Sequence, residues 1–124
     1  MIKNKKEFKA LVERYETIGL EEIKEAWDSI ISSTQNYSGK YGIPAARELT
    51  GFGSMKTCVL CISVKNKCSV CVYSYRYTED FGCINEKNYP TFEGIKTTDT
   101  PEELLEAFRK RAEHLRTNYA KHLV

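Results

Sequence analysis

Five cysteines carry the clearest chemical signal in this chain of 124 residues. Four of them form two C-x2-C pairs, and the fifth follows after eleven further residues: Cys58 and Cys61, Cys68 and Cys71, then Cys83. Each C-x2-C pair can bring two thiolates to one metal ion, and two pairs can complete the four-sulfur tetrahedral shell of a structural zinc site. The sequence therefore predicts a structural Zn2+ that is bound by four of the five cysteines.

The cysteine spacing leaves the fourth zinc ligand open. The spacer over 62–67 has the length of a short hairpin that would return the second pair to the first, and Cys68 would then complete a symmetric double knuckle. Cys83 would instead clamp a later loop onto the hairpin, and Gly82 before it suits a close approach. The alternatives to zinc are cysteines that are buried as small apolar residues, a redox site, or iron.

Helical patterns surround this cysteine-rich segment. Apolar residues recur at helical spacing over 4–16 and again over 20–33, and we expect these two helices to pack as an antiparallel pair. The buried face of the second helix would consist of Ile23, Trp27, Ile30 and Ile31. A short helix over 45–49 would end at Gly51. A long C-terminal helix would begin at the cap residue Thr100 and keep its apolar stripe almost to the end of the sequence.

Residues 72–77 alternate between tyrosine and other residues, which predicts a β-strand. Tyr73, Tyr75 and Tyr77 would share one face of that strand, and residues 79–98 are expected to be irregular. The predicted fold class is therefore α+β: an N-terminal helical pair, a central zinc-knuckle hairpin with a short antiparallel sheet, and a long C-terminal helix.

The length of the chain predicts a single domain with a modest core that a zinc staple would support. This domain would extend over 1–124. It would have a helical part at 1–52, a cysteine-rich part at 53–98 and the C-terminal helix at 99–124.

The charges of the chain are balanced, with 19 basic and 17 acidic residues. Only residues 53–98 are basic, with six basic groups against four acidic ones. A Zn(Cys)4 centre carries two negative charges, so this excess can simply balance the metal site. The alternative is a nucleic-acid-binding patch formed by Lys56, Lys65, Lys67 and Arg76. A chain so balanced lacks the strong basic footprint of a dedicated nucleic-acid-binding protein.

Two surfaces could bind a partner protein. The first is the tyrosine face of the predicted strand, because tyrosine is favoured at interface hot spots. The second is the basic face of the C-terminal helix, on which we select Arg109 and Arg116. The alternative is that the tyrosines pack on a helix and that the arginines belong to a solvated helix face.

The sequence contains no recognisable catalytic arrangement. The two histidines, His114 and His122, are eight residues apart, and no motif places a base beside a cysteine nucleophile. The protein is therefore not expected to be an enzyme. No apolar stretch approaches the length of about 18 residues that would span a membrane, and the first residues lack the apolar core of a signal peptide. We therefore expect an intracellular protein with reduced thiols.

The cysteine-rich segment resembles a known group of proteins. Its order of C-x-L-C, a second C-x2-C, G-C and a proline-containing loop is similar to that of small cysteine-rich zinc proteins encoded by phages and prophages. The matching elements are Cys58–Cys61, Cys68–Cys71, Gly82-Cys83 and Asn88-Tyr89-Pro90, all within residues 58–90. Val72 stands where the group usually has proline.

This resemblance implies a zinc-stabilised phage accessory protein that inhibits a host defence nuclease. Within that class the chain is similar to zinc-containing anti-CRISPR proteins, which bind the Cas9 nuclease of type II-A systems. The resemblance thus implies a stoichiometric Cas9 inhibitor in the bacterial cytoplasm, with Cas9 or its guide-RNA complex as the partner. The alternative function is that of a small zinc-stabilised, nucleic-acid-binding phage regulator.

Overall fold

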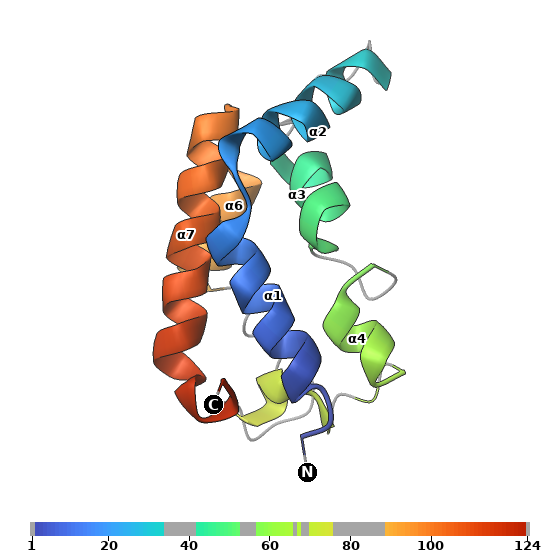
Figure 1. The fold of residues 1–124 in the computed structure, drawn as a ribbon, viewed down its shortest axis with the longest axis vertical. Coiled ribbons are helices and arrows are strands. Elements are labelled where there is room, and N and C mark those ends of the chain that lie inside the picture. The colour runs from blue at the N-terminus through green and yellow to red at the C-terminus, as the bar shows by residue number, and fades with distance from the viewer. Residues whose placement is uncertain are drawn as a thin grey trace.

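The computed structural model describes residues 2–33, 42–52, 57–65, 67, 70–75 and 89–123. These residues form an assembly of helices (Figure 1). The α-helices are α1 (Lys5–Thr17), α2 (Leu20–Ser33), α3 (Gly42–Thr50), α4 (Val59–Ser63), α6 (Pro90–Lys96) and α7 (Pro101–Asn118). Two short 3-10 helices complete the described elements, η2 (Val72–Tyr75) and η3 (Ala120–His122). None of the described helices is long and apolar enough to cross a membrane.

The predicted α+β fold with an antiparallel sheet is wrong, because the described residues contain helices and no strand. The predicted strand begins instead as the 3-10 helix η2. Its first two residues, Val72 and Tyr73, are both buried in the core. A strand would point successive side chains to opposite faces, so the burial of both neighbours in one core favours the 3-10 turn.

The predicted zinc-knuckle hairpin is also wrong in its first half, which forms the helix α4. The chain turns after α4 through Lys65, whose φ angle of 51° lies in the left-handed region. The amide N–H of Lys67 donates to the carbonyl oxygen of Val64 at 3.0 Å. A turn therefore occurs where the hairpin tip was expected, but it follows a helix.

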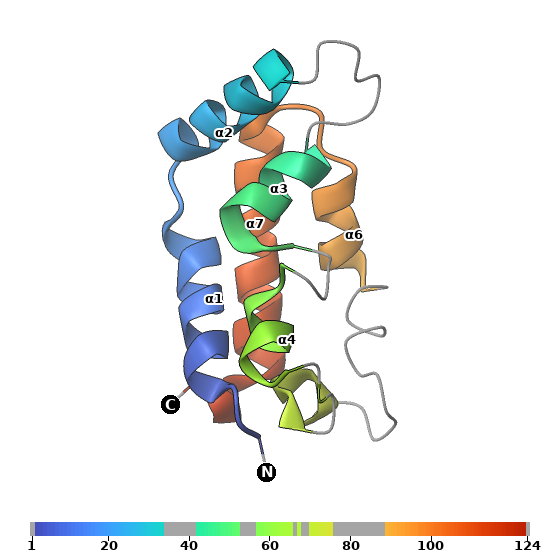
Figure 2. The same ribbon diagram turned by 90° about the vertical axis from the view of Figure 1, so that its right-hand side faces the viewer.

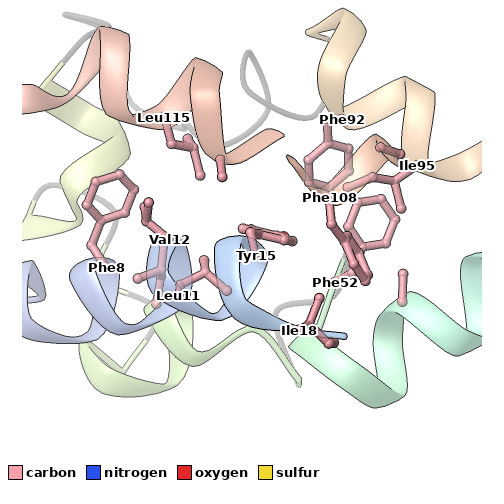
Figure 3. Close-up of a cluster of buried hydrophobic side chains, with 14 of the residues drawn as sticks. Phe8, Leu11, Val12, Tyr15, Ile18, Phe52, Phe92, Ile95, Phe108 and Leu115 are labelled. Carbon is pink, nitrogen blue, oxygen red and sulfur yellow. The ribbon is translucent and has the colours of Figure 1, made fainter. Parts of the chain in front are cut away.

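The helices α1 and α7 lie side by side and antiparallel along the length of the molecule (Figures 1 and 2). The apolar stripe expected on α1 is confirmed, since Phe8, Leu11, Val12 and Tyr15 are all buried. Phe108 and Leu115 of α7 lie across from this stripe (Figure 3), and Leu104 belongs to the same buried cluster. The rings of Tyr15 and Phe108 lie with their centroids 5.4 Å apart, which joins the two helices near the middle of α7.

The expected antiparallel pairing of the first two helices does not occur. The bounds of α2 match the expected 20–33, but α2 packs mainly on α3 and α7 while α1 packs mainly on α7. The chain leaves α1 in an extended conformation at Ile18, which is itself buried, and α2 then crosses one end of α7. This crossing leaves Ile31, which was expected on the buried face, 43% exposed, whereas Trp27 lies in the core as expected.

The predicted start of the C-terminal helix is confirmed at α7. The side chain of Thr100 accepts a hydrogen bond from the amide N–H of Glu103 at 3.1 Å, and Pro101 occupies the first turn. The helix ends at Asn118, earlier than expected, because the chain bends at Tyr119 to bury that ring completely.

The region expected to be irregular contains the helix α6. Pro90 begins this helix, and Phe92 and Ile95 bury its inner side. The ring of Phe92 stacks on that of Phe52 at 4.2 Å, which joins α6 to the chain after α3. The short segment between Pro90 and Thr98 gave too little periodicity for the sequence to indicate a helix.

The predicted end of the short helix at Gly51 is confirmed, and it depends on the absence of a side chain at this residue. Gly51 has a φ angle of +74°, and its amide N–H donates to the carbonyl oxygen of Arg47 at 2.8 Å. A Cβ atom at this position would lie 2.1 Å from the carbonyl oxygen of Thr57. Only glycine fits both this backbone angle and the close approach of Thr57, in the segment that leads into α4.

We expect Gly51→Ala to lower the free energy of unfolding by about 1–2 kcal/mol or more, because alanine is strained at this angle and would collide with Thr57. Denaturant unfolding followed by circular dichroism measures this change. Gly19→Ala is the matched control, since a Cβ there meets no atom within 4 Å and its φ angle is not positive. The control is expected to change stability by less than about 1 kcal/mol. Equal effects of the two substitutions would contradict this role of Gly51.

Candidate metal-binding cysteine segment

The first C-x2-C pair lies at the start of α4. Cys58 is the residue that caps this helix, and Cys61 lies in its first turn, three positions later. The cap residue and the third helical residue of a helix face one another, as in a capping box. The helix thus brings the side chains of Cys58 and Cys61 to one side of its beginning, and both residues are partly buried.

Cys71 lies in a different environment, buried beside the N-terminal segment. Its Sγ atom accepts a hydrogen bond from the side-chain amide of Asn4, with a distance of 3.3 Å between Nδ2 and Sγ. An N–H···S hydrogen bond of this kind orients a sulfur and stabilises negative charge on it, as the outer partners of metal ligands do.

The same amide of Asn4 connects Cys71 with the α4 segment. Nδ2 of Asn4 also donates to the carbonyl oxygen of Leu60 at 3.2 Å, and Oδ1 accepts from the backbone N–H of Val72 at 2.8 Å. A backbone hydrogen bond of 2.8 Å from Lys3 to Val70 extends this junction. The residues next to Cys61 and Cys71 are therefore held on one fully buried side chain.

Asn4 did not emerge from the sequence as a structural residue of this segment. The only signal for it was its position directly before α1, where asparagine commonly caps a helix. Asn4 does occupy the cap position of α1, but its side chain makes no capping hydrogen bond. Both polar atoms of the side chain are instead committed to residues more than fifty positions away.

The predicted zinc ligands are only partly within the described chain. Cys58, Cys61 and Cys71 are described, whereas Cys68 and Cys83 lie outside the described residues. Within the described ranges, no group of three or more histidine, cysteine, aspartate or glutamate residues is positioned to hold a metal ion. Zinc binding by four of the five cysteines therefore stays a prediction. Among the described residues, the first C-x2-C pair lies at the start of a helix, and Cys71 is buried and hydrogen-bonded to Asn4.

Tyr73, which was selected for the partner surface, belongs to the core. Its ring packs edge-on against those of Phe8 and Tyr119, and its hydroxyl oxygen accepts a hydrogen bond from Arg111. Burial raises the pKa of the Tyr73 hydroxyl, so this group stays neutral at any ordinary pH. The side chain of Tyr75 and the whole of Tyr77 lie outside the described residues.

The two arginines selected for the partner surface both contact α1. The guanidinium of Arg109 donates to the carbonyl oxygens of Tyr15 and Ile18, each at 2.7 Å, and so satisfies the C-terminal end of α1. Arg116 forms an ion pair with Glu16, which holds the pKa of the Glu16 carboxyl below its usual value. Both side chains thus help to fix α1 on α7.

Arg111 is a further residue of α7 that the sequence analysis did not single out. It is fully buried, and it donates to the hydroxyl oxygen of Thr91 at 3.1 Å and to that of Tyr73 at 3.4 Å. Its guanidinium carbon also lies 5.2 Å from the centre of the Phe92 ring, a distance typical of a cation–π contact. A signal existed, because Arg111 lies seven residues after Leu104 and so falls on the apolar stripe of the helix.

Comparison with known proteins adds nothing to these assignments: no family model matches the chain, and no curated protein or solved structure is significantly similar to it.

We expect Asn4→Ala to lower the free energy of unfolding by about 3 kcal/mol. The substitution would leave the buried backbone N–H of Val72 without its partner, at a cost of about 1–3 kcal/mol. It would also remove the hydrogen bonds to the sulfur of Cys71 and to the carbonyl oxygen of Leu60, which would keep only the hydroxyl of Ser63. Denaturant unfolding measures the loss. The control is Asn118→Ala, which removes only contacts to His114 on the same helix and is expected to cost about 1 kcal/mol or less. A loss at Asn4 no greater than that at Asn118 would contradict the role of the buried amide.

The zinc prediction is tested by metal analysis and by melting of the purified protein. The wild-type chain is expected to contain stoichiometric zinc, and Cys61→Ser and Cys71→Ser are each expected to lose the metal and to melt at a lower temperature. Serine can still accept the hydrogen bond from Asn4, so a loss at Cys71→Ser reports on the metal. The control in α4 is Ser63→Ala, which removes one hydrogen bond to Leu60. Metal-free wild-type protein, or cysteine variants that keep their zinc, would refute the assignment.

Proposed function

We propose that this protein is a phage-encoded, zinc-stabilised inhibitor that binds a host defence nuclease, the Cas9 of type II-A systems, in the bacterial cytoplasm. It acts stoichiometrically by occupying a protein surface. The resemblance of the cysteine-rich segment supports the assignment to this class and to this partner. The observation that supports protein binding most directly is an apolar surface on α4.

Two neighbouring apolar side chains of α4 point away from the core. Val59 is 38% exposed and Ile62 is 57% exposed, whereas Leu60 between them is completely buried. Val59 and Ile62 are three residues apart and so share one side of the helix, which we call the α4 outer face. Paired apolar residues on an outer helix face are a common feature of protein-binding surfaces.

The α4 outer face suits a protein partner for energetic reasons. Full burial of an isoleucine side chain contributes about 1.5–3 kcal/mol, so covering Ile62 and Val59 together can provide a central part of a binding interface. The junction around Asn4 holds α4 on α1, and that attachment keeps the outer face fixed before the partner binds. A surface that is already ordered loses little conformational entropy on association.

The proposed zinc would have a structural role in this function. It would join the first turn of α4, through Cys58 and Cys61, to the segment that carries Cys71, with Cys68 or Cys83 as the fourth ligand. Four thiolates leave no open position on zinc for a water or a substrate. The metal would thus stabilise the helix that carries the binding surface.

The test is a binding assay between the purified protein and Cas9, alone and with guide RNA. We expect a stable complex with the wild-type protein and at least tenfold weaker binding by Ile62→Asp, because a buried carboxylate would replace an apolar contact. Ile31→Asp is the matched control, since Ile31 is also exposed but lies on α2. It is expected to bind as the wild-type protein does.

The outcomes separate the parts of the proposal. Absence of binding to Cas9 in both forms would reject Cas9 as the partner. Binding that is weakened equally by Ile62→Asp and Ile31→Asp would reject the α4 outer face as the contact surface. Thermal melting of both variants shows whether either substitution has disturbed the fold.

A further inference from the structure

Three segments that are far apart in the sequence meet at the end of the molecule where both termini lie (Figure 2). They are the start of α1 with the residues before it, the turn after α4, and η3 at the C-terminus. The hydrogen bond from Lys3 to Val70, and that from Val70 to Lys67, join the first two segments. The third segment, η3, packs against α1.

Lysine dominates all three segments. They carry seven lysines and one histidine: Lys3, Lys5, Lys6, Lys9, Lys65, Lys67, Lys121 and His122. All seven lysines are exposed. The acidic residue among residues 2–9, 64–67 and 119–123 of the sequence is Glu7, which is partly buried. We call this surface the basic end.

The positive potential of the basic end acts on its own histidine. Burial lowers the pKa of His122, and the neighbouring charges of Lys5 and Lys121 lower it further. The cause is geometric: η3 packs on α1, which places Lys5 and Lys121 near the same imidazole. The packing of these segments thus brings like charges together at this end of the molecule.

Half of the acidic residues of the described chain lie on α2 and at the start of α7, at the other end of α7 from the basic end. Four lie on α2 and three in the first turns of α7: Glu21, Glu22, Glu25, Asp28, Glu102, Glu103 and Glu106. The small net charge of +2 therefore does not exclude a local excess of positive charge at the basic end. Counts of charges along the sequence do not detect this local excess, because the segments of the basic end are distant in sequence.

We propose that the basic end binds the phosphate backbone of a nucleic acid without regard to base sequence. Its residues are lysines on flexible stems, a type that contacts phosphates as point charges and is depleted at protein–protein interfaces. Contacts of this kind position a protein on a nucleic acid but carry no base information. The positive end of the α1 dipole points to the same surface and adds to its attraction for phosphate.

This inference does not depend on the proposed function, because it uses neither the cysteines nor the α4 outer face. It also differs from the patch that the sequence suggested. Of that patch, Lys65 and Lys67 belong to the basic end, whereas Lys56 and Arg76 lie outside the described residues. The additional lysines come from α1 and η3, which the sequence does not connect with the cysteine-rich segment.

The experiment measures binding of the purified full chain to a short labelled DNA duplex of arbitrary sequence. We expect binding that weakens about 100-fold between about 50 and 200 mM salt, as about four phosphate contacts predict. The double variant Lys6→Ala/Lys65→Ala is expected to reduce the salt slope by about two, roughly one for each lost contact. A second duplex with a different sequence is expected to bind equally well.

The matched control is Lys24→Ala/Lys110→Ala, which removes two lysines from α2 and α7 and is expected to leave the slope unchanged. Circular dichroism melting of both double variants confirms that they fold. Absence of binding at low salt, or equal losses in the two double variants, would overturn the proposal. Binding to poly-glutamate as tight as binding to the duplex would also overturn it, in favour of an acidic protein as the partner.

Discussion

The buried amide of Asn4 joins three parts of the chain that the sequence keeps far apart. It accepts from the backbone of Val72 and donates to the carbonyl of Leu60 and to the sulfur of Cys71. Leu60 and Val72 are completely buried, so without Asn4 the N–H of Val72 would have neither this partner nor water, and the carbonyl of Leu60 would keep only the hydroxyl of Ser63. The positions of α4 and η2 relative to α1 therefore depend on this side chain, and so does the relative placement of the cysteines on those segments.

The helix α7 organises the rest of the molecule through three arginines with different roles. Arg109 satisfies the last carbonyls of α1, Arg116 pairs with Glu16, and Arg111 lies inside the core among Tyr73, Thr91 and Phe92. A buried guanidinium is tolerated because hydrogen bonds and an aromatic face replace part of its hydration. Arg109, Arg111 and Arg116 therefore make contacts within the fold. The surface that we propose for partner binding lies on α4 instead.

The two surfaces proposed for binding have different chemistry and separate supports. The α4 outer face is apolar and would take its energy from burial against a protein. The basic end consists of exposed lysines and would take its energy from contacts with phosphates and from the release of counterions. The α4 outer face and most of the basic end lie on segments that Asn4 joins. The turn after α4 and the start of α1 both belong to the basic end.

Features that depend on neighbouring residues could be predicted from the amino-acid sequence. The bounds of α1 and α2, the capped start of α7 at Thr100 and the stop at Gly51 follow from apolar periodicity, from caps and from a glycine angle, all of which act within a few residues. The C-x2-C spacing likewise predicts a zinc site from local pattern alone. Its first pair could not be assigned to a helix, because five residues carry too little periodicity.

The contacts between distant segments could not be predicted in this way, because they depend on the packing of the whole chain. The apolar stripe of α1 could have packed on α2, but it packs on α7, and the alternating tyrosine segment begins as a 3-10 helix because Val72 and Tyr73 both enter the core. The role of Asn4, the burial of Arg111 and the gathering of lysines at one end all arise between residues distant in sequence. Such contacts depend on the packing of the whole chain. An apolar helix stripe or a buried polar group requires a partner, but the local sequence does not indicate which residue that partner is.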